Sequence, residues 1–270
     1  MIGETGEKVV RAEILTSAAN PLLKQVRRAM ARGARTDEGF CVAETFHLLD
    51  EALASGCAIG AVLCSDSARA AVEARLRGRP ETRLLAVSDA LFRSLSDTEA
   101  AQGVMALVRP PEWEIDRLFE GVALVAVLDG VQDPGNAGAI LRAAEAFGAT
   151  GALFLKGSVS PYNPKAVRAS AGSVFRLPLV AGLPAEAARA ALEARGLDVH
   201  AAAPAGAVEL SRADLTRACA FVIGSEGRGV SPEWSAASRL RIPTRGVESL
   251  NAAAAAAILL YEARRQRSGL

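Results

Sequence analysis

The chain has 270 residues, of which 50% are hydrophobic and 23% charged, with a formal net charge of +1. This composition is typical of a folded globular protein and excludes a disordered chain, and the length favours two domains over one. No apolar run reaches the roughly 20 residues of a membrane-spanning helix. Strongly basic domains are the usual sign of nucleic-acid binding, so a net charge of +1 gives no evidence for it. Any such evidence must come from local clusters of basic residues.

The N-terminus and the cysteines indicate the cellular compartment. Glu4 and Glu7 precede any apolar stretch, unlike a secretory signal, so we expect a cytoplasmic protein. The four cysteines form no C-x-x-C pair, and the chain has two histidines. We therefore expect free, buried thiols and no metal site.

The first hundred residues alternate between helical and strand-like patterns. Helices are expected over 20–32, 45–55 and 67–77, and strands over 40–43, 59–64, 83–87 and 103–108. Two prolines, Pro110 and Pro111, then interrupt the pattern, because proline ends regular structure and favours extended backbone. We predict a small α/β domain over residues 1–108 and a linker over 109–120.

The helix expected near residue 20 is strongly basic. Five basic residues fall within twelve positions without an acid: Lys24, Arg27, Arg28, Arg32 and Arg35. Contacts from such a patch to phosphates would give an affinity that falls with salt. The cluster is a candidate nucleic-acid surface, and the alternative is a solvated helix face in an arginine-rich chain.

The region after residue 120 predicts a second α/β domain, over 121–270. Strands are expected over 122–128, 152–155, 197–201, 219–223 and 240–242. One helix is expected directly after the first strand, a second from about residue 164, and two more over 184–195 and 249–267. Continuous aliphatic strands that alternate with helices are typical of a parallel sheet covered on both faces.

The first of three glycine-rich segments is 128–142. Gly135 and Gly138 allow close backbone approach, and Asn136 is suited to cap the helix that follows. The free N–H groups at such a helix start bind anions such as phosphate. Arg142 lies about one and a half turns further along. The alternative is an ordinary capped turn followed by a surface arginine.

The second segment, 221–233, follows another buried strand, and Ser231 is expected to cap a short helix that begins at Pro232. Its glycines have the order G-x-x-G-x-G, which differs from the G-x-G-x-x-G of dinucleotide-binding proteins. This order counts against a nucleotide-dependent oxidoreductase.

The third segment, 242–251, leads into an alanine-rich helix that either Ser249 or Asn251 would cap. Small side chains let another backbone approach, so part of this helix is expected to face a second subunit. Because the carboxyl ends of parallel strands share one edge of a sheet, we expect the three segments to form one ligand-binding crevice.

In order and spacing, the three segments resemble the signature motifs of the SpoU (TrmH-like) family of SPOUT methyltransferases, which are D-P-x-N-x-G-x-x-x-R, G-x-E-G-x-G and I-P-x-x-G…S-L-N. The match spans residues 121–267. Residues 17–24 and 100–104 resemble, more loosely, the substrate-binding domain of that family. The resemblance implies an RNA ribose 2′-O-methyltransferase that uses S-adenosylmethionine. Ribosomal RNA is the first expectation for its substrate, with transfer RNA or an antibiotic-resistance role as alternatives.

The resemblance also implies a deep trefoil knot and a homodimer whose active sites draw on both subunits. Cofactor contacts would come from Gly224, Gly227, Ile242 and Leu250, and the catalytic residues would be Asn136, Arg142, Glu226, Ser249 and Asn251. Since arginine is a poor base, Arg142 is expected to grip phosphate and stabilise oxyanion charge. Glu226 would accept a proton, orient Arg142 or tie down its own loop. The basic cluster at residues 24–35 would then bind RNA.

The chain departs from the family pattern at three places. The third motif has one residue fewer than usual between Gly246 and Ser249, and alanines follow Asn251 where a valine-serine-valine stretch is common. Thr45 stands after Glu44 where glycine is common. All the polar catalytic positions are occupied, which argues against a catalytically silent RNA-binding member.

Overall fold

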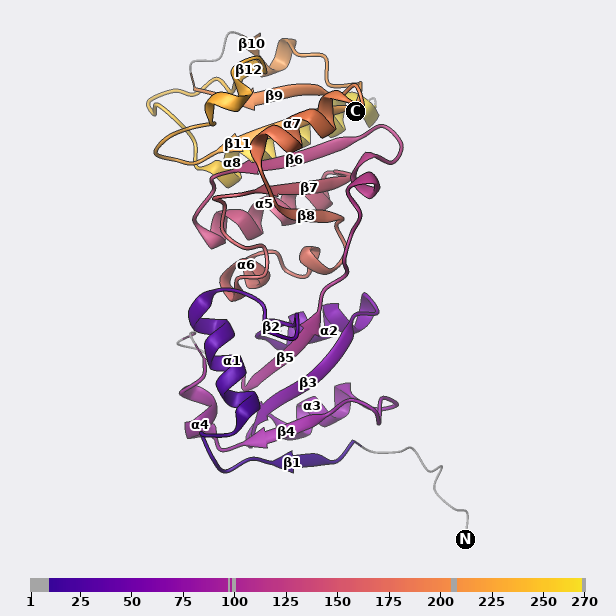
Figure 1. Cartoon of the computed structure of the whole chain (residues 1–270), viewed down its shortest axis with the longest axis vertical. Coiled ribbons are helices and arrows are strands. Elements are labelled where there is room, and N and C mark those ends of the chain that lie inside the picture. Colours follow the sequence, from indigo (N-terminus) through magenta and orange to yellow (C-terminus); the bar gives the residue numbers. More distant parts are fainter. Residues whose placement is uncertain (1–9, 97, 99–100, 205–207, 269–270) are drawn as a thin grey trace. The chain divides into compact units, whose positions relative to one another are not determined.

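A computed structural model describes residues 10–96, 98, 101–204 and 208–268. Two compact units make up the chain, Met1–Pro111 with Tyr162–Phe175 (unit 1) and Glu112–Pro161 with Arg176–Leu270 (unit 2). Figure 1 shows the elements of each unit. Glu4, Glu7 and Ala100, which entered the expectations above, lie outside the described residues.

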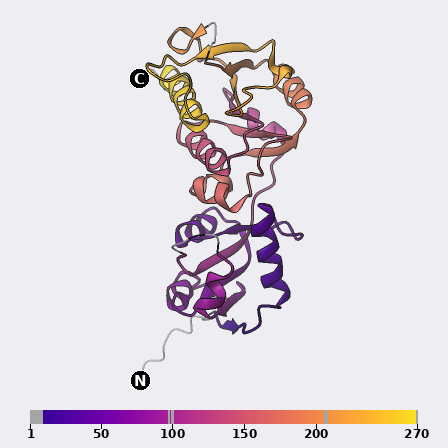
Figure 2. The ribbon, with the colours of Figure 1, turned by 90° about the vertical axis from the view of Figure 1, so that its left-hand side faces the viewer.

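Unit 1 is built on a five-stranded mixed sheet of order β1-β4-β3-β5-β2. Strands β1, β4 and β3 are parallel, whereas β5 runs antiparallel to both β3 and β2. Helices cover both faces of the sheet, as Figure 2 shows. The strands are β1 (Ala12–Ile14), β2 (Cys41–Ala43), β3 (Ala58–Ser65), β4 (Leu84–Val87) and β5 (Val104–Arg109), and the helices are α1 (Pro21–Arg32), α2 (Phe46–Ala54), α3 (Arg69–Arg75), α4 (Asp89–Arg93) and α6 (Pro164–Ala169).

Helix α1 has clear start and stop signals. The Asn20 side chain accepts a hydrogen bond from the N–H of Leu22, Pro21 takes the first helical position, and Gly33 ends the helix in the left-handed conformation. Apolar residues at helical spacing, among them Leu23 and Val26, are buried against the sheet. The basic residues of α1 therefore occupy the opposite, exposed face.

The segment 162–175 belongs to unit 1, although it lies beyond residue 121 where the second domain was predicted to begin. Helix α6 packs against β2, and the guanidinium of Arg168 pairs with the buried Glu44 carboxylate at 3.2 Å. Ser96 and Thr98 also donate to that carboxylate. A buried charge needs such partners, so this network holds the segment on unit 1.

Thr45, the residue where the family commonly has glycine, has a φ of 157° and a ψ of 158°. This region of backbone space is populated mainly by glycine. In this chain the Thr45 hydroxyl accepts a hydrogen bond from the N–H of Leu48 and so caps α2.

Unit 2 confirms the expected α/β fold with a parallel sheet. Its seven strands have the order β10-β12-β9-β11-β6-β7-β8, and every neighbouring pair is parallel. The strands are β6 (Leu124–Asp129), β7 (Gly151–Leu155), β8 (Leu179–Leu183), β9 (Asp198–Ala202), β10 (Val208–Glu209), β11 (Cys219–Gly224) and β12 (Ser238–Arg241), and the helices are α5 (Pro134–Ala146), α7 (Ala185–Glu193) and α8 (Ala252–Ser268).

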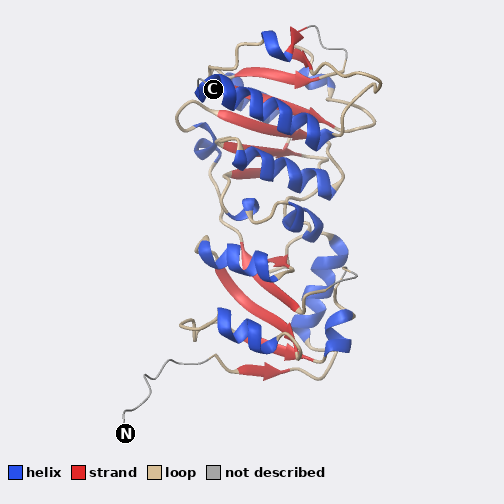
Figure 3. Cartoon of the chain, turned by 180° about the vertical axis from the view of Figure 1, so that it is seen from behind, coloured by secondary structure: helices blue, strands red, loops and turns tan. Residues whose placement is uncertain are grey.

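Helices cover both faces of this sheet. Helices α5 and α8 pack side by side on one face, as seen in Figure 3, and α7 packs on the other. All residues of β6 are buried, as expected for a central strand between two helical layers. Strands β8 and β10 were not predicted, because β8 is a half-exposed edge strand and β10 has only two residues.

The end of α8 is fastened to the amino-terminal edge of the sheet. The Arg267 guanidinium donates to the backbone carbonyls of Val122, Ala123 and Leu215 at 2.9, 3.1 and 2.9 Å, and also to that of Arg217. These contacts join the helix to the start of β6 and to the segment before β11.

All four cysteines are free and buried, as predicted. Burial raises the pKa of the Cys41 thiol to about 12 and that of Cys219 to about 11, so these thiols stay protonated at neutral pH. No helix among the described residues is long and apolar enough to cross a membrane.

Candidate functional site

The three glycine-rich segments meet at the carboxyl edge of the unit 2 sheet. The first follows β6 and enters α5, the second follows β11, and the third connects β12 to α8. Strands β6 and β11 are direct neighbours in the sheet. The chain continues from β6 to β7 on one side and reaches β9 and β12 on the other, so the segments converge where α/β sheets commonly bind ligands.

The predicted cap of α5 was wrong. The cap is Asp133, whose carboxylate accepts a hydrogen bond of 2.7 Å from the N–H of Asn136, and Pro134 takes the first helical position. Aspartate caps as well as asparagine does, and its place directly before proline was the signal in the sequence. Asn136 therefore lies inside the first turn, with its side chain available for other contacts.

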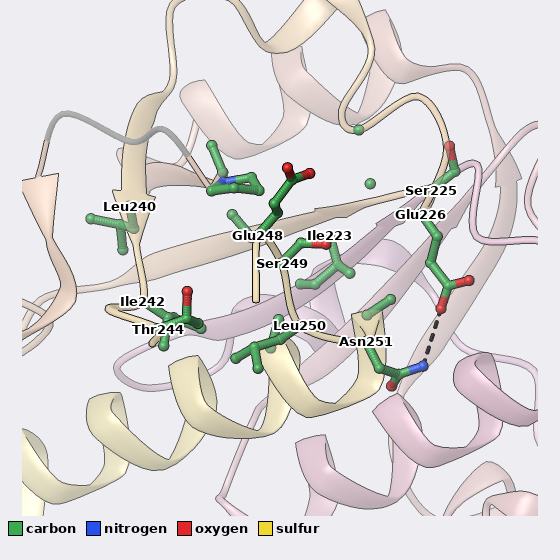
Figure 4. Close-up of a pocket in the computed structure, with 17 residues that line it drawn as sticks. Ile223, Ser225, Glu226, Leu240, Ile242, Thr244, Glu248, Ser249, Leu250 and Asn251 are labelled. Atoms are coloured by element: carbon green, nitrogen blue, oxygen red, sulfur yellow. Dashed lines mark hydrogen bonds between the residues drawn. The ribbon is translucent and has the colours of Figure 1, made fainter. Parts of the chain in front are cut away.

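That side chain joins a polar cluster contributed by all three segments. The Asn136 amide donates to Glu226 Oε1 at 2.7 Å, and the Asn251 amide donates to Asn136 Oδ1 at 2.9 Å and to Glu226 Oε1 at 3.1 Å. Figure 4 shows the bond between Asn251 and Glu226. Three of the five residues predicted to be catalytic thus form one hydrogen-bonded group, which we call the Asn–Glu–Asn cluster.

Asn251 also caps α8, one of the two alternatives expected from the sequence. Its Oδ1 accepts hydrogen bonds from the N–H groups of Ala253 and Ala254 at 3.0 and 3.2 Å. The two ends of one amide therefore have separate tasks, because the oxygen holds the helix and the nitrogen holds the cluster.

The second segment turns back on itself directly after β11. Backbone hydrogen bonds join Ser225 and Gly229 in both directions, at 3.1 and 2.8 Å. A Cβ at Gly224 would lie 2.1 Å from the carbonyl carbon of Gly229, so this turn requires glycine at position 224. The turn places Glu226 beside the start of α5.

Ser231 was expected to cap the short helix η4 (Pro232–Trp234), and this expectation was wrong in part. Pro232 does take the first position, but the Ser231 side chain makes no capping hydrogen bond. The Ser231 N–H instead donates to the buried Asp129 carboxylate at 2.6 Å, which ties the second segment to the end of β6.

A cavity of about 540 Å³ opens beside the cluster (Figure 4). The segments after β9, β11 and β12 and the first turn of α8 form its wall. Most of the lining side chains are small or aliphatic: Ala202, Ala203, Pro204, Ile223, Leu240, Ile242, Leu250, Ala252 and Ala255. Its polar lining includes Glu226, Glu248, Ser249 and Asn251.

A second cavity, of about 260 Å³, shares part of this wall. It lies between the first two segments, and its lining includes Gln132, Asp133, Asn136 and Arg228. Glu226 lines both cavities, whereas Asn251 lines the larger and Asn136 the smaller. The Asn–Glu–Asn cluster therefore stands at the junction of an apolar cavity and a polar one.

The structure does not bring every predicted residue to this junction. Gly224, Ile242, Leu250 and Ser249 line the larger cavity, but Gly227 lines only the smaller one. Arg142 is exposed on α5 and lines neither cavity.

The basic cluster of unit 1 is partly neutralised. The carboxylate of Asp37, which follows the cluster in sequence, pairs with Arg28 at 3.1 Å and lies 4.0 Å from Arg32. Arg27 approaches Ser94, and Arg35 lies over the Tyr162 ring at 4.8 Å. Residues 24–35, the range from which the cluster was predicted, contain no acid. Asp37 lies outside that range but reaches the cluster because the chain turns back after α1.

Sequence reasoning also missed part of the cavity wall. The last residue of β9, Ala202, and the two residues after it line the larger cavity, as do Thr244 and Glu248 of the third segment. These residues could not be predicted, because the sequence does not show that β9 lies between β11 and β12 in the sheet. The described residues hold no group of three or more His, Cys, Asp or Glu side chains that could bind a metal.

Comparisons with known proteins agree with this geometry. The SpoU rRNA Methylase family model matches residues 123–261, and the MRM3-like substrate binding domain matches residues 20–106. An uncharacterised tRNA/rRNA methyltransferase of Synechocystis sp. is 33% identical over 94% of this chain and 94% of its own. The 23S rRNA (guanosine(2553)-2'-O)-methyltransferase RlmP of Bacillus subtilis is 30% identical over 93% of this chain and 98% of its own.

A solved structure extends the comparison to the fold. The SpoU methyltransferase AviRb from Streptomyces viridochromogenes, crystallised in complex with AdoMet, superposes with a TM-score of 0.82. It is 29% identical, and the match covers 92% of this chain and 98% of that one. With matching motifs, matching fold and relatives of the same length, the chain belongs to the SpoU rRNA methylase family.

Proposed function

We propose that the protein transfers a methyl group from S-adenosylmethionine to a ribose 2′-hydroxyl of ribosomal RNA. The observation that carries the proposal is the Asn–Glu–Asn cluster at the junction of the two cavities. A transfer reaction needs donor and acceptor on opposite sides of one reacting point. Ribosomal RNA is favoured over transfer RNA because several similar relatives are named as 23S rRNA methyltransferases.

The larger cavity fits the cofactor. Its volume lies within the range of about 300–1,000 Å³ that is usual for small-molecule sites. Aliphatic side chains such as Ile242 and Leu250 suit an adenine ring, and the exposed backbone around Gly224 offers hydrogen-bonding groups. S-adenosylmethionine supplies, when bound, an activated methyl group on a positively charged sulfur.

The smaller cavity would receive the acceptor ribose, with Glu226 as the proton acceptor. Both asparagine amides donate to Oε1 of Glu226, so among the described residues Oε2 has no donor. The attacking hydroxyl would donate its proton to Oε2 while its oxygen bonds to the methyl carbon, and the carbon–sulfur bond would break to leave S-adenosylhomocysteine. The two asparagines hold the carboxylate in position for this step.

Arg142 would reach the reaction centre from a second protomer. The arginine is exposed and lines neither cavity of its own chain, and a guanidinium can grip phosphate and stabilise oxyanion charge. Ile258 and Tyr261, on the neighbouring helix α8, are large exposed apolar side chains. Covering them in a homodimer would bury apolar surface on α8, the helix that packs against the one that carries Arg142.

Unit 1 would hold the RNA. It contains the match to the substrate binding domain, and Lys24 and Arg27 of its basic cluster form no ion pair among the described residues. We also propose the trefoil knot of the family, in which the segment between β12 and α8 is threaded through the chain. A cytoplasmic location is part of the same proposal, because ribosomal RNA is modified where ribosomes are assembled.

The test is transfer of labelled methyl groups from S-adenosylmethionine to ribosomal RNA, followed by mapping of the modified ribose. Arg142→Ala is expected to lower transfer by about a hundredfold or more, while cofactor affinity stays within a few-fold. Arg189→Ala, on α7, is the matched control. Transfer to no RNA by the wild-type protein would indicate a silent RNA-binding member, and equal loss of transfer and cofactor affinity would make Arg142 structural.

A further inference from the structure

We infer that Glu248 binds a positively charged group of the cofactor. The inference rests on the proposed function and concerns the same cavity. Of the described side chains that line the larger cavity, two are charged, and both are acidic: Glu226 and Glu248. No lysine, arginine or histidine stands among these lining residues. The wall therefore carries negative charge without a compensating cation.

The two carboxylates differ in their surroundings. Glu226 accepts hydrogen bonds from both asparagines of the cluster, whereas Glu248 has no hydrogen bond or ion pair among the described residues. Figure 4 shows the Glu248 carboxylate apart from the bonded Glu226–Asn251 pair. Thr244 and Val247 of the same loop are joined by a hydrogen bond of 2.9 Å, which helps to shape the segment that carries Glu248. This carboxylate is free to meet a ligand.

The ligand supplies the opposite charge. S-adenosylmethionine carries a sulfonium, an ammonium and a carboxylate, and therefore a net charge of +1. Transfer of the methyl group removes the sulfonium charge, so the product S-adenosylhomocysteine keeps the ammonium but is neutral overall. Glu226 and Glu248 are both solvent-exposed, so their attraction for a cation is screened by water and modest. Two carboxylates and no cationic side chain among the described lining residues still favour a ligand with positive charge.

Calorimetric titration of three ligands into the whole protein separates the possible partners. S-adenosylmethionine has both cationic groups, S-adenosylhomocysteine has only the ammonium, and 5′-methylthioadenosine has neither. The variants are Glu248→Gln, which removes the charge at nearly constant shape, and Glu233→Gln as a control. Glu233 is an exposed acid of unit 2 that lines neither cavity.

Glu248→Gln is expected to weaken S-adenosylmethionine binding about fivefold, less so at high salt, and to leave 5′-methylthioadenosine binding unchanged. A loss confined to S-adenosylmethionine would assign the contact to the sulfonium, and an equal loss for S-adenosylhomocysteine would assign it to the ammonium. Glu233→Gln should change none of the three.

Two results would overturn the inference. Unchanged S-adenosylmethionine affinity in Glu248→Gln would show that the carboxylate does not contact the cofactor. Parallel losses for all three ligands would show that loop shape, and not charge, depends on Glu248. In both cases the wild-type protein binds the cofactor and the proposed function stands. Failure of the wild-type protein to bind any of the three would refute the proposed function and the inference together.

Discussion

Asn251 offers a way to separate helix capping from the chemistry of the site. Its Oδ1 caps α8 through Ala253 and Ala254, and its Nδ2 donates to Asn136 and Glu226. Serine at this position keeps a capping oxygen but has no amide to donate. Alanine removes both functions. The two variants therefore lose different parts of the same side chain.

The expected stability changes follow from the capping contacts. Loss of an N-cap costs about 1 kcal/mol, so Asn251→Ala should lower the Tm by about 2–4 °C, and Asn251→Ser should stay within about 1 °C of wild type. Thermal unfolding followed by circular dichroism measures both. A Tm loss in Asn251→Ser as large as that in Asn251→Ala would refute the assignment of the cap to the side-chain oxygen.

The expected activity changes are larger and similar for the two variants. A hydrogen bond to a charged group contributes about 1.5–3 kcal/mol, which corresponds to a loss of methyl transfer of about ten- to a hundredfold when Nδ2 no longer holds Glu226. Labelled methyl transfer to ribosomal RNA measures this loss. If Asn251→Ser keeps wild-type transfer, the amide contact to Glu226 does not position the carboxylate, and the role proposed for the Asn–Glu–Asn cluster is wrong.

Two further predictions concern the cofactor loop and the anchor of α8. Gly224→Ala should weaken S-adenosylmethionine binding by more than about tenfold, because the added Cβ would collide with the backbone of Gly229. Gly227→Ala should weaken binding far less, since no atom lies within 4 Å of its added Cβ. Similar losses of affinity for the two variants in calorimetry would contradict the steric argument. Arg267→Ala should lower the free energy of unfolding in urea by about 2–4 kcal/mol, because it leaves several backbone carbonyls without their charged donor. Arg264→Ala, at an exposed position of the same helix, should change it by less than about 0.5 kcal/mol, and equal effects would show that the Arg267 contacts contribute little.

Local patterns in the sequence were sufficient for most of the fold. Buried strands such as β6 and β11 are recognisable as aliphatic runs in the sequence, and Asn20 and Asn251 cap α1 and α8. These signals depend on near neighbours in the chain, which is why sequence reading finds them. The edge strand β8 lacks such a signal, because half-exposed residues do not form a continuous apolar run.

The sequence indicated the three members of the Asn–Glu–Asn cluster but not their arrangement, and it missed part of the cavity wall. The motif spacing indicated Asn136, Glu226 and Asn251, but their mutual hydrogen bonds depend on β6 and β11 being neighbours and on α8 packing against α5. The same applies to Asp37, which lies beside Arg28 only because the chain reverses after Gly33.

The sequence by itself therefore determined the elements, the parallel α/β class and the chemical groups available for methyl transfer, because these depend on residue type and short-range spacing. Only the tertiary structure decided which groups meet. Long-range packing placed Glu226 at the junction of two cavities and kept Arg142 away from both. It also left Glu248 in the wall of the larger cavity without a hydrogen bond or ion pair to any residue that the structure describes. Such contacts join residues about a hundred positions apart, as in the 90-residue separation of Asn136 and Glu226, and no local pattern encodes them.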